Sequence, residues 1–317
     1  MGVALLTGPV TVLLAAYNGE AFLPAQLASL QAQEDADFSV LMQDDGSRDG
    51  TAALLAQTAD RDPRFRLGAC PGQHLGAIGN FWNLLGQTDA PYTALCDQDD
   101  VWRPQRLALG LAAMAAAEAE LPPDTPVLVH GDCRLMAEDG SVLKESFFAH
   151  QGWDPGAVTL APLLVQNNVT GCTVLINAPL RRLALEIGKP ERMFMHDWFL
   201  GLTAAAFGRV VFLPEALVDY RQHGQNVQGA SRKGLLARGM KALGAVERGK
   251  ARIALTYRHT AAFAEAAGER LPAEARRLTE AYLATEKMPK LQRIRTVRKL
   301  GCVMQSPVTR AGQVLFG

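Results

Sequence analysis

The N-terminal third of the chain alternates short apolar runs with segments of helical periodicity, and this alternation constrains the fold more than any other feature. The apolar runs fit buried strands at residues 10–16, 38–43, 64–70 and 92–96. Helical patterns follow them at residues 21–33, at 49–60, from Gly76 and from Pro104. Repeated strand and helix units imply a mostly parallel sheet with helices on both faces. We therefore predict an α/β fold whose ligands bind beyond the carboxyl ends of the strands.

Size and composition indicate a globular protein. The chain has 317 residues, of which 48% are hydrophobic and 20% charged, so it can bury a substantial core. The apolar run at 108–117 is too short to cross a bilayer, and the stretch 201–218 is interrupted by Arg209 and Pro214. The five cysteines are widely spaced, without a C-x-x-C pair, and fit neither a disulfide framework nor a zinc site. We expect a cytoplasmic protein.

Charge divides the chain into two parts. The formal net charge is zero, but residues 231–317 contain 18 Lys and Arg against 6 Asp and Glu, whereas residues 1–230 contain 14 against 26. The basic part is also rich in Ala and Leu at helical spacing and lacks the strand-like runs of the first part. We predict a boundary near Ala230, with an α/β domain at 1–230 and a basic helical region at 231–317.

Polar clusters stand where three of the predicted strands end, at residues 15–20 (AAYNGE), 44–50 (DDGSRDG) and 97–100 (DQDD). Ordinary turn chemistry could explain any one of them, because Asn, Asp and Gly tolerate the left-handed backbone of sharp turns. Parallel strands, however, bring all three clusters to one edge of the sheet. Their coincidence there favours a ligand site.

The third cluster places three carboxylates within four positions. A helix cap could use Asp99 or Asp100 ahead of the helix at Pro104, but it leaves Asp97 unexplained. Carboxylates at positions i and i+2 around a turn can direct their oxygens to one point. A hard divalent cation, Mg²⁺ or Mn²⁺, accepts such oxygens and completes its coordination with water and substrate phosphates. We predict that a cation arriving with a diphosphate neutralises these acids.

The clusters, taken together, resemble the motif series of family 2 glycosyltransferases with the GT-A fold. Further motifs follow in the order seen in the bacterial polysaccharide branch often called rhamnosyltransferase-like. They read HLGAIGNFWNLL (74–85), NNVTGCTVLIN (167–177), MHDWFL (195–200) and DYRQHGQNV (219–227). The resemblance covers residues 10 to 230, implies a GT-A catalytic domain there, and leaves the helical C-terminal extension unexplained.

The resemblance assigns donor-binding roles to the first clusters. Tyr17 and Asp45 are expected to hold the base and ribose, with the backbone of Ala15 and Ala16 shaping the base pocket. Asn80 is expected to face the nucleotide or the donor sugar, although it could equally cap or line a helix.

The remaining donor and metal residues come from the later motifs. Asp97 and Asp99 form the D-x-D element, and Asp99 is the first candidate for direct metal contact. Gly171 is expected beneath the donor sugar. Arg221 suits a phosphate oxygen, and His223 the metal or the diphosphate. His223 could also be a plain surface histidine in a loop.

The expected reaction is a single in-line displacement, which inverts the anomeric centre. Such a step needs a stabilised leaving group and one general base for the acceptor hydroxyl. By resemblance the base is Asp197, in MHDWFL. The alternative for Asp197 is a helix N-cap.

Other classes fit less well. A dinucleotide dehydrogenase needs G-x-G-x-x-G where this chain reads AAYNGEAF, and a sugar nucleotidyltransferase needs a glycine-rich basic loop there. A glycoside hydrolase would leave the metal-type acids unexplained. The remaining alternative is a catalytically degenerate protein that binds nucleotide sugars.

We therefore predict an inverting, metal-dependent glycosyltransferase of cell-surface polysaccharide synthesis, using Mg²⁺ or Mn²⁺. The branch favours deoxythymidine-diphosphate rhamnose as the nucleoside-diphosphate sugar donor. The expected acceptor is a saccharide, lipid-linked in many enzymes of this resemblance, and no nucleic acid partner is expected.

The basic tail predicts a second kind of contact. In residues 287–301, apolar and basic side chains recur at helical spacing on opposite sides, the pattern of an interfacial helix. The apolar set is Leu291, Ile294, Val297 and Leu300, and the basic set is Arg293, Arg295, Arg298 and Lys299. We expect peripheral contact with anionic membrane at the inner face of the cell membrane.

Overall fold

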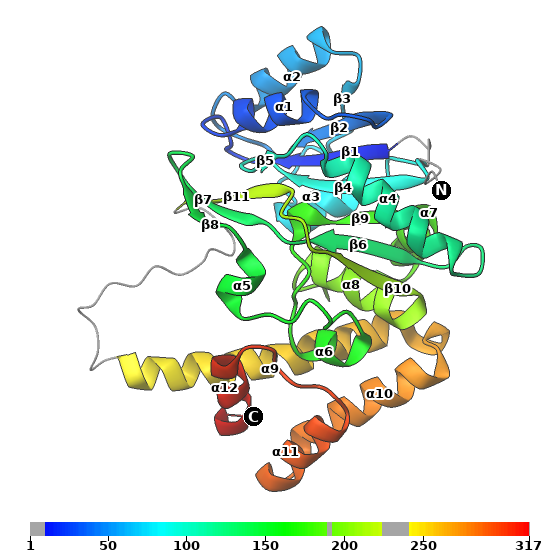
Figure 1. Cartoon of the computed structure of the whole chain (residues 1–317), viewed down its shortest axis with the longest axis vertical. Coiled ribbons are helices and arrows are strands. Elements are labelled where there is room, and N and C mark those ends of the chain that lie inside the picture. The colour runs from blue at the N-terminus through cyan, green and yellow to red at the C-terminus, as the bar shows by residue number, and fades with distance from the viewer. Residues whose placement is uncertain (1–9, 189–191, 224–240, 317) are drawn as a thin grey trace.

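A seven-stranded sheet forms the centre of the protein. The computed structural model describes residues 10–188, 192–223 and 241–316. The strand order is β10-β6-β9-β4-β1-β2-β3, and every neighbouring pair is parallel except those of β9, which runs antiparallel to β4 and β6 (Figure 1). The strands are β1 (Val10–Ala16), β2 (Phe38–Asp44), β3 (Phe65–Leu67), β4 (Tyr92–Asp97), β6 (Val127–Gly131), β9 (Leu175–Asn177) and β10 (Arg209–Leu213).

The predicted α/β class with a mostly parallel sheet is confirmed, and the predicted strand and helix positions agree to within a few residues. The expected strand at 64–70 is shorter, at Phe65–Leu67. The sequence patterns did not reveal that β9 enters the sheet between β4 and β6 in the opposite direction.

Alternating side chains of β1 feed two separate cores. Leu13 belongs to the hydrophobic cluster on one face of the sheet, whereas Val12 and Leu14 belong to the cluster on the other. Successive side chains of a strand point to opposite faces, so an entirely apolar strand must be covered on both sides. Helices provide this cover: α1 (Leu23–Gln31), α2 (Thr51–Arg61) and α4 (Arg106–Ala119) on one face, and α3 (Gly76–Leu85), α7 (Ala178–Ile187) and α8 (His196–Phe207) on the other.

A smaller, four-stranded sheet lies next to the carboxyl ends of the central strands. Its order is β5-β11-β7-β8, in which β11 is antiparallel to β5 and parallel to β7. The residues Glu138 and Asp139 occupy the tight turn between β7 and β8. The strands are β5 (Val101–Trp102), β7 (Arg134–Ala137), β8 (Val142–Lys144) and β11 (Val218–Gln222).

The C-terminal helices pack against the face of the sheet that carries α8 (Figure 1). His259 lies on the ring of Trp198 with centroids 4.1 Å apart, and the Thr260 hydroxyl donates to the Leu164 carbonyl at 3.0 Å. The predicted helical extension is present, but it shares one hydrophobic cluster with the central sheet. Its helices are α9 (Lys241–Ala267), α10 (Ala273–Ala284), α11 (Lys290–Lys299) and α12 (Pro307–Phe316), and the short α5 (Phe147–Gln151) and α6 (Leu160–Val165) lie nearby. The predicted boundary near Ala230 lies outside the described residues.

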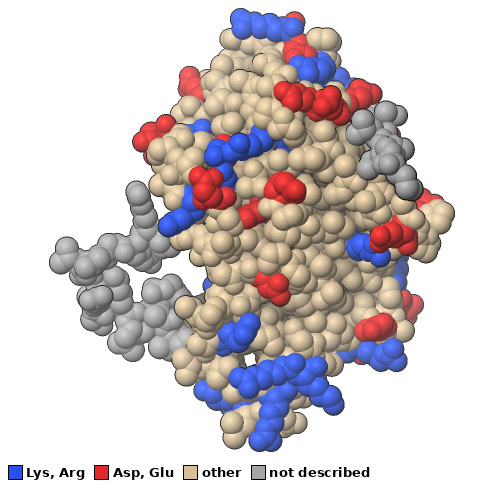
Figure 2. Space-filling view, in the orientation of Figure 1, with Lys and Arg blue, Asp and Glu red and all other residues tan. Residues whose placement is uncertain are grey.

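Basic side chains gather on the outer side of these C-terminal helices, at the bottom of the view in Figure 2. Helix α11 forms where the sequence predicts an interfacial helix, but part of its apolar stripe is used internally. Val297 is 7% exposed and Leu300 packs against the core, whereas Leu291 is 73% exposed. No helix within the described ranges is both long and apolar enough to cross a membrane.

The shared core generates a stability prediction. Met304 follows α11 and is 1% exposed within the cluster that includes residues of the central sheet. Met304→Ala should lower the free energy of unfolding by about 2–5 kcal/mol, because it leaves a cavity in this core. Leu291→Ala, in the same region but exposed, should change it by less than about 0.5 kcal/mol. Denaturant unfolding measures both, and equal small effects would mean that the C-terminal helices fold apart from the sheet.

Candidate active site

The three polar clusters meet at one edge of the central sheet. In the parallel pairings of β1, Ala16 lies opposite Asp44 of β2, and Ala15 lies opposite Asp97 of β4. The chain therefore leaves all three strands at the same level. The convergence predicted from the sequence is present.

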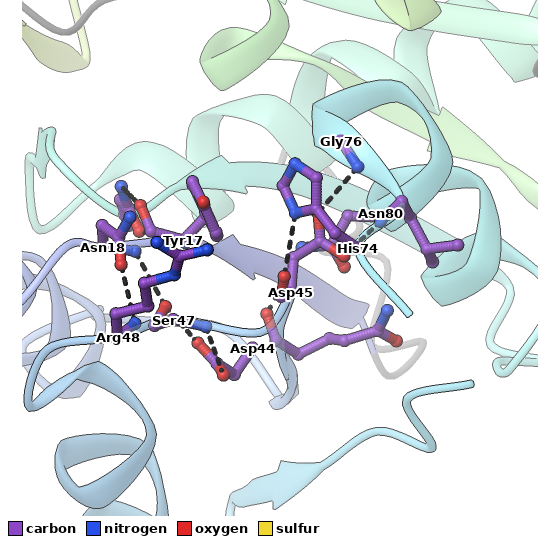
Figure 3. Close-up of polar contacts among 12 residues, drawn as sticks. Tyr17, Asn18, Asp44, Asp45, Ser47, Arg48, His74, Gly76 and Asn80 are labelled. Atoms are coloured by element: carbon purple, nitrogen blue, oxygen red, sulfur yellow. Dashed lines mark hydrogen bonds and ion pairs between the residues drawn. The ribbon is translucent and has the colours of Figure 1, made fainter. Parts of the chain in front are cut away.

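Many polar groups of the first two clusters form hydrogen bonds with each other. The Asn18 N–H donates to the Ser47 hydroxyl at 2.8 Å, and the Arg48 N–H donates to Asn18 Oδ1 at 2.8 Å (Figure 3). Asn18 has φ 49° and Gly46 has φ 83°, left-handed values that favour Asn and Gly. The turn interpretation is thus correct for these two residues, and the turns also join the two loops.

Tyr17 and Asp45 lie close together, but only Tyr17 is open to solvent. The Tyr17 side chain is 40% exposed, and its ring centroid is 4.5 Å from that of His74. Asp45 is 1% exposed, and its two oxygens accept the N–H groups of Leu75 and Gly76, each at 2.7 Å (Figure 3). Asp45 therefore fixes the loop that precedes α3, and its predicted contact with a nucleotide stays a prediction.

The other residues predicted to shape the nucleotide pocket are mostly buried. Asn80 on α3 is 2% exposed, and its Nδ2 lies 3.4 Å from the Gln43 carbonyl, the arrangement expected if it lines the helix. Ala15 is partly buried, and the carbonyl of buried Ala16 accepts the Asp45 N–H at 2.9 Å. The backbone of the two alanines thus lies beside Asp45.

The third cluster contacts β11 from the small sheet. His223 Nε2 lies 2.8 Å from Asp99 Oδ2. Arg221 donates its backbone N–H to Asp100 Oδ1 at 3.0 Å and its Nε–H to the Asp99 carbonyl at 2.8 Å. Helix α4 begins at Arg106 and its N-cap residue is Gln105, so neither Asp99 nor Asp100 caps it.

Arg221 is held mainly by the backbone. Its guanidinium also donates to the Glu138 carbonyl at 2.8 Å, and the residue is 6% exposed. It braces the acidic turn against β11 and the turn between β7 and β8. These bonds direct the guanidinium to backbone carbonyls, and its contact with a donor phosphate stays a prediction.

The acidic cluster carries more negative charge than its surroundings stabilise. Burial raises the pKa of Asp97 to about 8, with further contributions from the charges of Asp99 and Asp197. Burial also raises the pKa of Asp100 well above its usual range, again with help from Asp99 and Asp97. Oxygens of Asp97 and Asp100 and the Cys172 sulfur lie within 4.8 Å of one another.

These donors fit a hard divalent cation. Carboxylate oxygens are the ligands such cations prefer, and a bound cation would restore the ionised forms that mutual repulsion disfavours. The Cys172 thiol does not compete as a ligand, because burial raises its pKa well above the usual value and keeps it protonated. Of the predicted metal ligands, Asp97 belongs to this group, whereas Asp99 and His223 contact each other beside it. Asp100 was not predicted.

Asp197 lies across from this cluster at the start of α8. The N-cap of α8 is Met195, so Asp197 is a residue of the first helical turn and not the cap. Its Oδ1 accepts the Trp198 N–H at 2.6 Å and the Asn167 side-chain amide at 3.1 Å. Burial raises the pKa of Asp197 to about 6, although these hydrogen bonds and one from the Gly171 backbone lower it. A carboxyl group with such a pKa can exchange protons near neutral pH.

Gly171 begins the short 3₁₀ helix Gly171–Thr173 directly beside Asp197. A Cβ atom at Gly171 would lie 3.4 Å from Asp197 Oδ2 and 3.4 Å from His196 Nε2. A side chain here would therefore crowd the carboxylate.

Two residues near Asp197 were given no role from the sequence. Asn167 orients the carboxylate, and only its place in the motif NNVTGC could have drawn attention to it. His196 is 5% exposed, stacks on Phe81 with centroids 4.3 Å apart, and has a pKa that burial lowers to about 4. It is a neutral imidazole beside the carboxylate, and its position next to Asp197 was the available signal.

Comparison with known proteins shows which family and which folds the chain resembles. The sequence model of Glycosyl transferase family 2 matches residues 11–133. An uncharacterized protein of Mycobacterium tuberculosis (strain ATCC 25618 / H37Rv) is 26% identical over 69% of this chain and 60% of its own length, so the chain spans less than two thirds of that relative. The dTDP-rhamnosyl transferase RfbG of Shigella flexneri is 24% identical, over 69% of this chain and 74% of its own.

Solved structures share the fold at low sequence identity. Staphylococcus aureus TarS 1–349 in complex with UDP-GlcNAc superposes with a TM-score of 0.60 at 14% identity, covering 96% of this chain and 88% of that one. The mannosyltransferase PcManGT from Pyrobaculum calidifontis, in complex with GDP-Man and Mn²⁺, gives a TM-score of 0.52 at 17% identity, covering 92% and 72%. The chain therefore has the predicted GT-A fold, and residues 11–133 match the model of Glycosyl transferase family 2, in agreement with the resemblance identified in the sequence.

Proposed function

We propose that this protein is an inverting, metal-dependent glycosyltransferase that moves a sugar from a nucleoside diphosphate to a saccharide acceptor in cell-surface polysaccharide synthesis. The observation that carries the proposal is the pairing of an oxygen-rich acidic cluster with a separate carboxyl group, Asp197, whose pKa is raised to about 6. The two serve opposite ends of one displacement: one supports the leaving diphosphate, and the other accepts a proton.

Asp197 acts as the general base. Its carboxylate is oriented by Asn167 and by the Trp198 N–H, so the oxygen that remains can take the proton of an acceptor hydroxyl. The raised pKa makes it a stronger base than an exposed aspartate, while it remains ionised at neutral pH.

The donor lies between Tyr17 and the acidic cluster. Tyr17 offers an exposed aromatic ring against which the nucleobase of the donor can stack. Asp97 and Asp99 would hold Mg²⁺ or Mn²⁺, with His223 orienting Asp99 through its 2.8 Å contact. A bound divalent cation would supply Lewis-acid stabilisation of the diphosphate as it leaves.

The donor sugar we favour is rhamnose on deoxythymidine diphosphate, since a relative named dTDP-rhamnosyl transferase is similar over most of the chain. The rival is a catalytically degenerate nucleotide-sugar-binding protein. Asp97, Asp99 and Asp197 at one edge of the sheet argue for turnover, and an assay separates the two.

Metal dependence is tested by assaying a panel of nucleotide sugars for release of free nucleotide with a saccharide acceptor. Release should require Mg²⁺ or Mn²⁺ and stop in chelator, because the carboxylates otherwise repel the diphosphate. Asp99→Asn should lower turnover at least about a hundredfold, since it removes an electrostatic contribution to the leaving group. Asp139→Asn, an exposed acid in the turn between β7 and β8, is the matched control and should behave as wild type. Full activity in chelator would remove the cation from the mechanism.

The role of Asp197 is tested by pH. The value of kcat/KM should rise with pH through about 6, because protonated Asp197 cannot act as a base and the ionised form appears above its pKa. Asp197→Asn should reduce turnover by about 10²–10⁴ with donor binding nearly unchanged, and it should abolish this acid limb. Near-normal turnover in the variant, or retained anomeric configuration in the product, would contradict the scheme.

Beyond the active site, we propose that the protein works in the cytoplasm on the inner face of the cell membrane, where it meets a lipid-linked saccharide. The C-terminal helices carry exposed basic residues, among them Arg295, Arg298 and Lys299, beside the exposed apolar Leu291 and Leu315. The Lys290 ammonium group donates to the Leu315 carbonyl at 2.9 Å, so α11 and the end of α12 form one surface. Basic side chains around exposed leucines are typical of a surface that binds anionic lipid.

Vesicle sedimentation tests this contact. The protein should bind vesicles that contain anionic lipid at low salt, and added salt should weaken binding. Arg295→Gln with Arg298→Gln should weaken it by about tenfold or more, at about 1 kcal/mol per basic residue. Arg61→Gln with Arg66→Gln, on the opposite end of the molecule, is the control of equal charge change. Equal losses in both double variants, or no binding by the wild type, would overturn the proposal.

A further inference from the structure

The side chain of Gln98 continues a strand pairing that the backbone cannot. Pairing between β1 and β4 ends at Ala15 and Asp97, because the chain after Asp97 turns toward Asp99. Beyond that point, the Tyr17 N–H donates to Gln98 Oε1 at 2.6 Å, and Gln98 Nε2 donates to the Tyr17 carbonyl at 2.8 Å. A side-chain amide carries both a donor and an acceptor, like a peptide group, so it can replace the missing backbone partner.

Gly19 leaves the space that Gln98 occupies. A Cβ atom at Gly19 would lie 2.3 Å from Gln98 Oε1 and 2.5 Å from Gln98 Cδ. Gly19 itself is fixed from the other side, since its N–H donates to the Thr51 hydroxyl at 2.8 Å and its carbonyl accepts the Leu23 N–H at 2.9 Å. A side chain at position 19 would therefore displace Gln98 rather than move the Gly19 backbone.

The contact links two parts of the proposed donor site. Tyr17 carries the exposed ring proposed to contact the nucleobase. Gln98 lies in the sequence between Asp97 and Asp99, the residues proposed to hold the cation. The Tyr17 backbone receives both of its bonds to this turn from one side chain. Gln98 thus extends the link between β1 and β4 as far as Tyr17.

We propose that Gln98 is a positioning residue that holds Tyr17 in register with the acidic turn, and that Gly19 exists to admit it. The identity of the ligand rests on the proposed function. The pair of hydrogen bonds between Gln98 and the Tyr17 backbone, here called the lock, does not depend on it. Asp197 lies on α8 and is oriented by Asn167, so loss of the lock should impair donor binding and spare proton transfer.

Hydrogen exchange of the full-length protein without ligand tests the lock directly. Gln98→Ala should speed exchange of the Tyr17 amide by about tenfold, as expected for the loss of about 1.4 kcal/mol of local stability. Gln98→Met keeps the length of the side chain and removes its hydrogen bonds, so it should behave like Gln98→Ala. Unchanged exchange in both variants would overturn the proposal, and unchanged exchange in Gln98→Met alone would reduce Gln98 to a packing residue.

A double-mutant cycle tests the part played by Gly19. Gly19→Ala and Gln98→Ala should each raise the donor KM by about tenfold with kcat within about threefold. The double variant should be no worse than either single one, because the added methyl group then meets open space. Additive losses, or a fall in kcat as large as the rise in KM, would overturn the proposal. If the wild type turns over no nucleotide sugar, the proposed function fails, whereas the exchange measurement still decides the lock.

Discussion

Repulsion among the carboxylates at the edge of the sheet is the constraint on which the rest of the site depends. Asp97 ends β4, Asp99 and Asp100 lie in the turn that follows, and the charge of Asp197 on α8 acts on Asp97. Buried like charges disfavour each other's ionised forms. Two of them are held in place by groups from distant parts of the chain: Asp99 by His223 and Asp100 by the backbone N–H of Arg221. The proposed cation, entering with the substrate, would supply the positive charge that the cluster lacks.

Those groups come from segments far from the turn in sequence. Arg221 and His223 reach it from β11, which is aligned by pairing with β5 and β7. Asp197 stands on α8, whose outer face is covered by α9 through the contact of His259 with Trp198. The sequence model of the family ends at residue 133, so the proposed base and the partner of Asp99 both lie beyond it. The small sheet and the C-terminal helices therefore belong to the site as supports.

The sequence predicts the edge of the sheet well, because that prediction needs only local patterns. Apolar runs locate β1, β2 and β4, and parallel pairing then forces the residues after them together. What the patterns do not predict depends on long-range packing. The antiparallel insertion of β9 is one case. The engagement of Asp45 by the backbone of Leu75 and Gly76 is another, since the motif DDGS alone reads as an acid available to a ligand. The alternative that Asp197 caps α8 is wrong by two residues, because the N-cap is Met195. Helix periodicity in the sequence does not locate a helix start that closely.

Arg221 shows how the role of a charged residue depends on its geometry. A planar guanidinium suits a phosphate, and the motif DYRQH invites that assignment. Here the same fork bonds the carbonyls of Asp99 and Glu138, and its positive charge is fixed behind the acidic turn. From that position it stabilises the backbone that presents the carboxylates, and its backbone N–H lowers the pKa of Asp100 against the effect of burial. Burial, with added repulsion from Asp99 and Asp197, raises the pKa of Asp97 to about 8. A carboxyl group whose pKa is raised in this way lowers the stability of the fold at neutral pH, and the proposed cation would offset that cost by favouring the ionised form.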